Sequence, residues 1–205
     1  MPPIGWIKRF EKTEYLLHWA HAVPYLILLI TGLSLAWEGF EGEQRSLLVG
    51  TFHEYVGVFL ILLPPITTLA GNSNVIYFNL RQIFSFTEDD KIWIKAQKSG
   101  EHTPQWKFNF GQKMNSIVSM ALSLSLQITG IWLWISPQGL LPRWGHIMLG
   151  FFALFALSGH LFMATINPST KKGLPGIFKG WVPRDYMEEH HQHQLDEIER
   201  GGVND

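Results

Sequence analysis

The chain has 205 residues, a formal net charge of −1 and no cysteine. The length corresponds to one or two domains, and the near-neutral charge gives no reason to expect nucleic acid as a partner. Without cysteine the chain cannot form a disulfide, a thiolate-bound zinc site or a cysteine-held iron–sulfur cluster, so any metal must be held by histidine, methionine or carboxylates.

Four apolar stretches alternate with polar connections. About 20 consecutive apolar residues are enough to cross a bilayer as a helix. We therefore expect an all-α integral membrane protein, a bundle of four transmembrane helices, with spans at residues 16–37, 50–70, 113–135 and 146–166. Residues 1–166 form the expected membrane domain and 167–205 a polar tail. The N-terminal segment lacks a small-residue cleavage site, so it is expected to stay as a first span rather than be removed as a signal peptide.

Histidines lie near the ends of three of these spans. His18 and His21 fall in the first turns of the first span, and His53 begins the second. The fourth span has His146 near its start and His160 near its end, whereas the third span has none. An ionisable side chain inside a membrane span is costly, which makes each of these histidines a candidate functional residue.

Other features of the chain are expected to shape the bundle. Pro64 and Pro65 should kink or end the second span, and the connection 71–112 should contain a short amphipathic helix around residues 80–98. The third span has small polar residues that are expected to pack against neighbouring helices. They are Ser116, Ser119, Ser123, Ser125 and Thr129.

The basic residues predict the orientation. The N-terminal segment, the middle connection and the tail, together with Lys113 at the start of the third span, hold 14 of the 16 Lys and Arg residues. The two other loops hold only Arg45 and Arg143. Because basic residues concentrate in cytoplasmic loops, we expect both termini in the cytoplasm and the protein in a bacterial inner membrane.

The four principal histidines then sort into two pairs of matching depth. His53 and His146 lie near the external face, and His18 and His160 near the cytoplasmic face. The spacing of His146 and His160 places both rings on nearly the same side of one helix, about 21 Å apart along its axis. Two axial imidazoles on facing helices, in an apolar slot, are what a six-coordinate haem b requires. Two haem b groups would give an electron path across the membrane.

Other interpretations of the histidines stay open. They could form a structural or proton-relay set, or bind zinc or copper. His21 lies about 60° round the helix from His18, so either could ligate; its depth favours His18. A metal or proton transporter would need a polar path between the two pairs, and a pure membrane anchor would not need histidines in both leaflets. The fourth span is apolar between its histidines, at Met148, Leu149, Phe151, Phe152 and Phe155.

Several supporting residues also have two interpretations. Five glycines would let a flat macrocycle or a neighbouring helix approach; they are Gly32, Gly57, Gly130, Gly150 and Gly159. Four basic residues would neutralise haem propionates or serve only as cytoplasmic charges; they are Lys8, Arg9, Lys107 and Lys113. The tail histidines are expected to be solvated or at a partner interface, with a metal patch as the alternative; they are His190, His191 and His193. His102 is expected at the surface.

At these residues the chain resembles the cytochrome b (gamma) subunits of membrane-bound respiratory formate dehydrogenases. RFEKTEYLLHW resembles the family's opening, HEYVG the start of its second span and KFNFGQK the segment before its third. GLPGIFKGWVPRDYMEEHH resembles the family's tail, with Tyr186 in place of the usual tryptophan. The b subunits of nickel–iron hydrogenases and thiosulfate reductases are similar in their four spans and histidine ligands, but match the GQK and HH stretches less well.

The resemblance implies an outer haem held by His53 and His146 and an inner haem held by His18 and His160. Electrons would come from an iron–sulfur partner subunit on the external side. Oxidation of the donor would take place on a further catalytic subunit of the molybdenum or tungsten type, because this chain has neither cysteines nor a soluble domain of sufficient size. Formate is the implied donor, and hydrogenase, thiosulfate reductase or other complexes could use the same module.

The resemblance also implies a quinone site beside the inner haem, for menaquinone or ubiquinone. Its residues would be Asn109, Gly111 and Gln112, with His160 close by. Side-chain amides can hydrogen-bond quinone carbonyls, and protons would come from the cytoplasm. The structural alternative for Asn109 is a helix N-cap.

Overall fold

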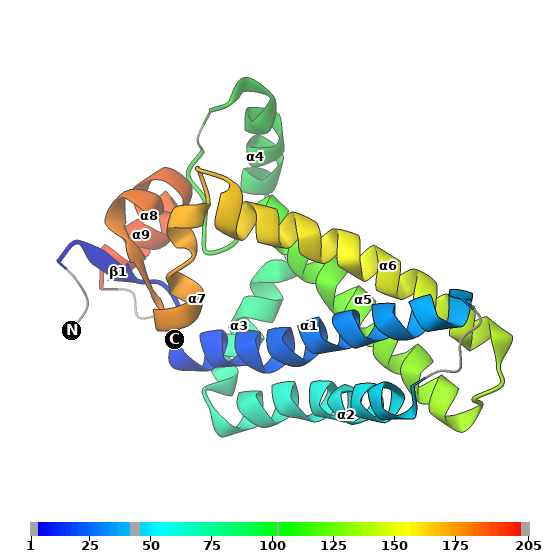
Figure 1. Cartoon of the computed structure of the whole chain (residues 1–205). Coiled ribbons are helices and arrows are strands. Elements are labelled where there is room, and N and C mark those ends of the chain that lie inside the picture. The colour runs from blue at the N-terminus through cyan, green and yellow to red at the C-terminus, as the bar shows by residue number, and fades with distance from the viewer. Residues whose placement is uncertain (1–3, 42–45, 102, 202–205) are drawn as a thin grey trace. The chain divides into compact units, whose positions relative to one another are not determined.

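The computed structural model describes residues 4–41, 46–101 and 103–201. Its largest elements are four long apolar helices, which run from blue through cyan and green to yellow in Figure 1. They are α1 (Lys12–Glu41), α2 (Leu47–Ala70), α5 (Phe110–Ile135) and α6 (Leu140–Leu161). Each is long and apolar enough to cross a membrane, which confirms the four expected spans.

The spanning segments begin earlier in the chain than expected. They are Lys12–Gly39, Leu47–Ala70, Phe110–Ile135 and Leu140–Ile166. Pro142 lies in the first turn of α6, where backbone N–H groups have no helical acceptor and proline is tolerated. His146 therefore lies inside α6 rather than at its start. The second helix continues past Pro64 and Pro65 to Ala70, so it does not end at these prolines.

Two helices, rather than one, occupy the connection between α2 and α5. They are α3 (Ser73–Ile83) and α4 (Glu88–Ser99), where a single helix around residues 80–98 was expected. The side chain of Asn72 caps α3, and the Thr87 N–H donates to the Asp90 carboxylate, 2.8 Å away, at the start of α4. Such caps satisfy N–H groups that have no helical acceptor, and they explain why the helix is interrupted here.

The tail is folded, and it adds a small sheet to a chain expected to be all-α. Strand β1 (Trp6–Lys8) pairs antiparallel with β2 (Trp181–Pro183), with Ile7 opposite Val182. Three-residue strands have too few positions to show alternation in the sequence, so this ribbon was not predicted. The tail also contains η2 (Lys171–Gly173), α7 (Gly176–Lys179), α8 (Arg184–His190) and α9 (Gln192–Glu199).

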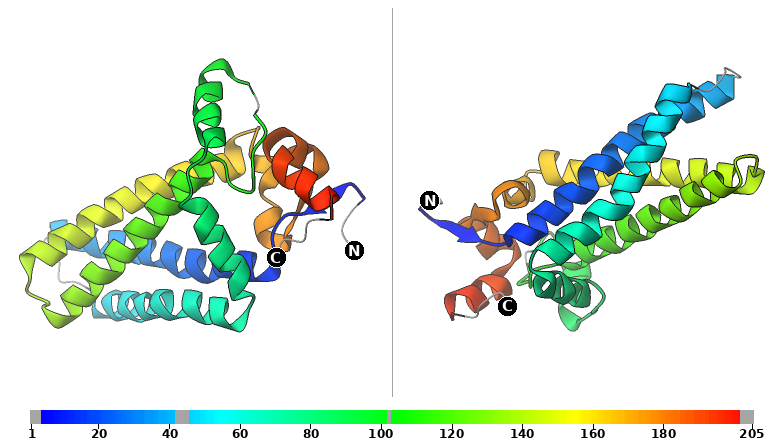
Figure 2. Two further views of the ribbon diagram at one scale, coloured as in Figure 1. Left: turned by 180° about the vertical axis from the view of Figure 1, so that it is seen from behind. Right: turned by 90° about the horizontal axis from the view of Figure 1, so that it is seen from below.

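A buried apolar cluster holds the sheet and the tail helices together, and Figure 2 shows this region from two sides. Its members are Val182, Tyr186, Met187 and Leu195, with Ile7 and Ile198 packed against them. Ile7 comes from the N-terminal arm, so the arm and the tail fold as one body. The tail is therefore not simply a polar extension.

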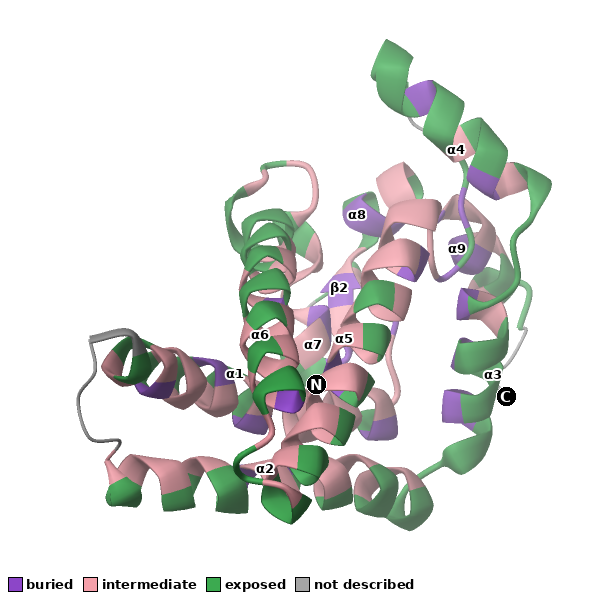
Figure 3. Cartoon of the chain, turned by 90° about the vertical axis from the view of Figure 1, so that its right-hand side faces the viewer, coloured by how far each residue is buried: buried purple, intermediate pink, exposed green. Residues whose placement is uncertain are grey.

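Contacts divide the chain into two compact units. Unit 1 comprises Met1–Leu16, Ala70–Ile117 and His160–Asp205, and unit 2 comprises Leu17–Leu69 and Val118–Gly159. The long helices carry mostly intermediate and exposed residues, coloured pink and green in Figure 3, as expected for apolar helices that face lipid. The expected domain boundary after residue 166 stays a prediction.

Candidate functional site

His53 of α2 and His146 of α6 meet inside unit 2. Their ring centres are 6.2 Å apart, and their planes are inclined by 80°. An imidazole nitrogen binds a metal ion at about 2 Å and lies about 1 Å from its ring centre, so two rings on opposite sides of one ion have centres about 6 Å apart. The separation of His53 and His146 fits this arrangement.

Each of these two rings contacts a threonine on the preceding long helix. The Nδ1 atom of His53 lies 2.7 Å from Oγ1 of Thr31 on α1. The Nδ1 atom of His146 lies 2.8 Å from Oγ1 of Thr129 on α5. Histidines that bind metals commonly use their second nitrogen for such a hydrogen bond, which fixes the orientation of the ring.

The glycines named in the sequence fall into two groups. Gly32 and Gly130 directly follow the two threonines, and a Cβ atom there would lie 3.1 Å and 3.5 Å from the Cε1 atoms of the two rings. Gly57 and Gly150 lie one turn after the histidines, and a Cβ atom at either, or at Gly159, would meet nothing within 4 Å. Gly32 and Gly130 therefore let the two histidine rings approach a helix backbone. The other three glycines border open space.

A cavity of about 420 Å³ lies beside the two rings, and apolar side chains of α1, α2, α5 and α6 form most of its wall. This volume is within the range of small-molecule and cofactor sites. Ser46 and Arg143 also border the cavity. Arg143 donates through Nη2 to the Pro137 carbonyl, 2.9 Å away, while its buried Nε has no partner among the described residues. A donor of this kind fits a carboxylate such as a haem propionate.

His21 is held by protein side chains. Its Nε2 lies 2.9 Å from Oγ of Ser123, and Gln127 donates to the same oxygen at 3.1 Å. The ring stacks on Tyr25, with centres 5.2 Å apart. Nε2 of His21 is therefore engaged by the protein, and the choice of His18 as the ligand of the first span stays a prediction.

The apolar residues between His146 and His160 were expected to exclude a polar path between the two histidine pairs. The structure weakens this argument. Met148 and Phe155 are 51% and 73% exposed, so they lie largely on the outer surface of α6. The polar side chains in the middle of unit 2 come from α1 and α5, at His21, Ser123 and Gln127. This hydrogen-bonded group was not expected.

His160 lies in unit 1, near the end of α6. Its Nδ1 is 3.2 Å from the side-chain amide of Asn115 on α5. The amide atom at this distance is Nδ2, which donates to Nδ1 and places the ring proton on Nε2. Metal binding through Nε2 requires the amide of Asn115 to be turned round, so that Oδ1 accepts from Nδ1. The π-helical turn η1 (Phe162–Ile166) begins two residues later, and such turns are frequent at functional sites. His18 belongs to unit 2, so its pairing with His160 stays a prediction.

The start of α5 is capped by two of the residues assigned to the quinone site. The Asn109 N–H donates to Oε1 of Gln112 at 3.1 Å, and the Gln112 N–H donates to Oδ1 of Asn109 at 2.9 Å. The structural alternative for Asn109, a helix N-cap, is therefore confirmed. A Cβ atom at Gly111 would lie 3.0 Å from Trp93, so this glycine is needed for packing. The capping contacts use the side-chain oxygens of Asn109 and Gln112 and do not involve their NH₂ groups. An NH₂ group can donate a hydrogen bond to a quinone carbonyl.

The segment before α5 is fixed at three consecutive carbonyl groups, those of residues 105–107. They accept from the His193 N–H at 3.1 Å, from Nδ1 of His191 at 2.7 Å and from Nη2 of Arg9 at 2.9 Å. The N-terminal arm and the tail thus hold the segment that leads into the capped turn. Through it, they support the position of Asn109.

The tail histidines were expected to be solvated or at a partner interface, and solvation is wrong for His191. His191 is completely buried, and Nε2 of His190 lies 2.8 Å from the Ser169 carbonyl oxygen. Within the described ranges, no group of three or more His, Cys, Asp or Glu residues is arranged to hold a metal ion. The expectation for His102 falls outside the described residues.

The basic residues named for propionate binding have protein partners. Nζ of Lys107 lies 2.7 Å from the Glu14 carboxylate, which also accepts from Asn79. Burial lowers the pKa of Lys107, while Glu14 acts in the opposite direction. Lys8 pairs with Glu11 at 2.6 Å near the surface.

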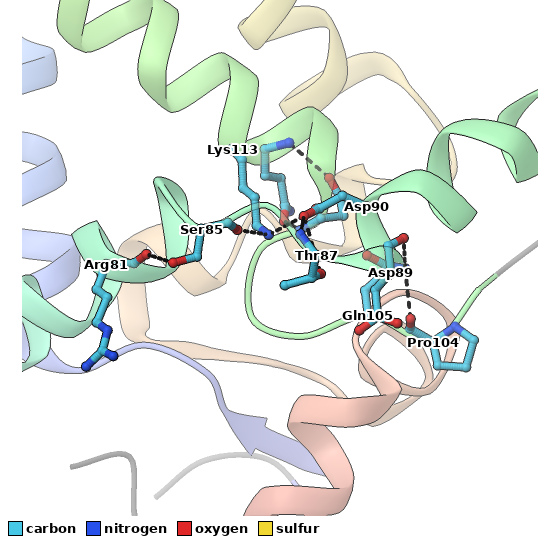
Figure 4. A network of polar contacts seen from close by, with 10 residues as sticks. Arg81, Ser85, Thr87, Asp89, Asp90, Pro104, Gln105 and Lys113 are labelled. Carbon is cyan, nitrogen blue, oxygen red and sulfur yellow. Dashed lines mark hydrogen bonds and ion pairs between the residues drawn. The ribbon is translucent and has the colours of Figure 1, made fainter.

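Lys113 is similarly engaged, as Figure 4 shows. Its Nζ lies 2.8 Å from the Asp90 carboxylate and 2.9 Å from the Ser85 carbonyl oxygen. Asp90 also caps α4 through Thr87. These ion pairs therefore join the middle connection to α5 and to the N-terminal arm, which gives the buried lysines a structural role.

Comparison with known proteins identifies the family of the chain. Residues 9–180 match the family model described as prokaryotic cytochrome b561. The chain belongs to this family. It is also 22% identical over 208 residues to the cytochrome b556(fdo) subunit of formate dehydrogenase from Escherichia coli strains K12 and O157:H7, which covers 95% of this chain and 94% of the relative. A short match, 42% identical over 43 residues, is to a putative manganese efflux pump, MntP, of Pectobacterium carotovorum and covers 21% of the chain.

Family membership makes the chain a multi-pass membrane cytochrome of the b type, and it implies haem b. The cavity in unit 2 fits such a group. It has two histidines at a suitable separation, open space beside two glycines and a basic side chain at its border. When bound there, haem b would supply one-electron redox chemistry.

The hydrogen-bonding partners of the histidines were not predicted from the sequence. Thr31 and Thr129 each lie in an Ile-Thr-Gly triplet, and this triplet occurs once in each half of the chain. For Thr129, only a role in helix packing was predicted. The first histidine of each following span is succeeded four residues later by glycine, as HEYVG and HIMLG. This double repetition is the signal that would have identified the threonines. Asn115 has no such signal.

Proposed function

We propose that this b-type cytochrome is a di-haem subunit that carries electrons across the membrane to quinone. His53 and His146 would hold an outer haem, and His18 and His160 an inner one. Electrons would come from an iron–sulfur subunit on the external side. Each quinone would take two electrons and two protons, the protons coming from the cytoplasm, and leave as quinol.

One observation carries this proposal. His53 and His146 come from different helices, lie 6.2 Å apart and both border the same largely apolar cavity. Both rings contact threonine through Nδ1, and metal-binding histidines commonly make such a hydrogen bond with the nitrogen that does not bind the metal. Among the described residues the two imidazoles are not part of a group of three or more His, Cys, Asp or Glu side chains able to hold a metal ion. A pair of imidazoles suits a haem better than zinc, which takes four protein or water ligands.

The quinone site is proposed at the start of α5. Asn109 and Gln112 have amide NH₂ groups outside their mutual capping contacts. Gln112 precedes Asn115 by nearly one helical turn, and Asn115 contacts His160. A quinone there would therefore lie near the inner ligand, with Asn109 and Gln112 as hydrogen-bond donors.

The donor and the partners are proposed from the relatives. Similarity to a formate dehydrogenase subunit supports a complex with an iron–sulfur subunit and a catalytic molybdenum or tungsten subunit. The positive charge on the termini and the middle connection supports their cytoplasmic location, in a bacterial inner membrane. Hydrogenase, thiosulfate reductase or other complexes are alternative settings for the same chain. The match to an efflux pump covers too little of the chain to favour transport.

The haem content of ligand variants tests the proposal. His53→Ala and His146→Ala should each leave one haem b per chain, and the double variant should also leave one, because both changes remove the same group. A control, His21→Asn, should keep two. A double variant without haem would show that the two histidines serve different haems, and unchanged haem content would reject the outer site.

A further inference from the structure

Thr31 and Thr129 each have their hydroxyl proton committed to their own helix. Oγ1 of Thr31 donates to the Ile27 carbonyl oxygen at 2.9 Å, and Oγ1 of Thr129 donates to the Ser125 carbonyl oxygen at 2.8 Å. A hydroxyl group has one proton and two lone pairs. Toward a histidine, each threonine oxygen can therefore only accept.

This arrangement determines which nitrogen of each ring is protonated. A neutral imidazole carries one N–H group, and its other nitrogen is an acceptor. His53 and His146 must donate from Nδ1 to reach the threonine oxygens at 2.7 Å and 2.8 Å. The proton is thus on Nδ1, and Nε2 presents its lone pair, which is the form that binds a metal.

We infer that Thr31 and Thr129 are positioning residues for the outer haem. Each would hold its histidine in the Nε2-ligating tautomer and at a fixed ring orientation. Because the donated N–H bond raises the basicity of the ligand, the threonines would also stabilise the oxidised iron and lower the reduction potential of this haem. The inference rests on the proposed function and assigns these threonines a role beyond helix packing.

The repeated sequence supports a shared role. The Thr-Gly pair of α1 meets the histidine that begins HEYVG on α2, and the Thr-Gly pair of α5 meets the histidine that begins HIMLG on α6. Each histidine comes from the next long helix in the chain, and each glycine lets the ring approach. If the two contacts served only helix packing, the same set of residues would not be expected at both: a Thr-Gly pair on one helix facing a histidine, with a glycine four residues later, on the next.

The test is a potentiometric titration of Thr31→Val and Thr129→Val in the holoprotein, with electron paramagnetic resonance of the oxidised haems. Valine keeps the shape of threonine and removes the acceptor. Each variant should raise the midpoint potential and change the resonance of one haem, the same haem in both. Loss of a hydrogen bond to a metal ligand commonly weakens metal binding by about 10- to 100-fold, so loss of that haem on dilution should also be faster.

Two controls separate this role from helix stability. Thr31→Ser and Thr129→Ser keep the hydroxyl group and should restore the potential. Thr67→Val alters a threonine of α2 that also donates to its own helix, to the Leu63 carbonyl oxygen at 2.8 Å, and it should change neither haem. If both valine variants retain wild-type potentials and resonances, the inference is overturned.

Other outcomes distinguish the inference from the proposed function. If the two valine variants shift different haems, the positioning role is supported but the pairing of His53 with His146 is wrong. If the purified protein has no haem, the proposed function fails, and ¹⁵N NMR of the same full-length chain still reports the tautomers. A proton on Nδ1 of both rings would then support the positioning role, and a proton on Nε2 would overturn it.

Discussion

Glu14 and Lys107 form a buried ion pair that joins the first turn of α1 to the segment before α5. The carboxylate and Nζ are 2.7 Å apart, and the two side chains are 7% and 5% exposed. Lys107 also contributes its carbonyl group to the contact with Arg9. The pair therefore links the N-terminal arm to the segment that leads into the proposed quinone site.

Glu14→Gln should destabilise this region, because it leaves a buried lysine without its counter-charge. Removing one partner of a buried pair typically costs about 3–5 kcal/mol, which thermal unfolding in detergent would measure. Burial lowers the pKa of Lys107 below 10.5, so in the window just below 10.5 the unfolded state holds more protons, and stability should rise with pH. Part of the loss should thus be recovered under alkaline conditions.

The control for this variant is Asp185→Asn, which breaks the exposed pair with Lys172. It should leave the melting temperature unchanged, since exposed pairs contribute little. Replacing both buried partners, as Glu14→Leu with Lys107→Met, should cost less than Glu14→Gln alone. Equal melting temperatures for Glu14→Gln and the wild type would contradict a stabilising role for the pair.

His191 should make the folded tail sensitive to acid. Burial, followed by the charge of Arg9, holds the pKa of His191 well below 6.5. Below about pH 6.5 the unfolded state therefore binds a proton that the folded state does not, and stability should fall by up to about 1.4 kcal/mol per pH unit. Limited proteolysis of the tail between pH 7 and pH 5 would measure the loss.

His191→Gln should lower stability at pH 7 and flatten this pH dependence, because the titrating group is gone. His193→Gln leaves His191 in place and should keep the wild-type dependence. The same steep acid sensitivity in His191→Gln would mean that another group is responsible.

Gln112→Glu separates helix capping from quinone binding. Glutamate keeps an oxygen for the Asn109 N–H, as in other capping boxes, but it has no NH₂ group for a quinone carbonyl. We expect an unchanged melting temperature and a fall of about tenfold or more in kcat/KM for quinone reduction, comparable to the loss of one good hydrogen bond to substrate. Asn109→Asp should behave alike. Normal quinone kinetics in both variants would place the quinone elsewhere.

Gly150→Leu should fill the space proposed for the outer haem. A Cβ atom at Gly150 meets nothing within 4 Å, and the residue borders the cavity. The chain should therefore fold but retain only one haem, as measured by its visible spectrum. Gly145→Leu also extends into open space on α6, away from the cavity lining, and should retain two. Full haem content in Gly150→Leu would contradict the assignment of the cavity.

The four spans and the approach of His53 to His146 could be predicted because they depend on local sequence. Apolar runs set the four helices, and the position of His53 and His146 along them set their common depth. The contacts of Thr31 and Asn115 could not be predicted, since they depend on how neighbouring helices are rotated. The β1–β2 ribbon and the burial of His191 depend on the meeting of distant segments, which composition alone does not show.

The central claim is that the four histidines hold two haem b groups. The most direct measurement is a dithionite-reduced minus oxidised visible spectrum of the purified protein, together with a pyridine haemochrome count per chain. The account predicts two haem b per chain. One haem would contradict the second histidine pair, and a chain without haem would contradict the proposed electron path altogether.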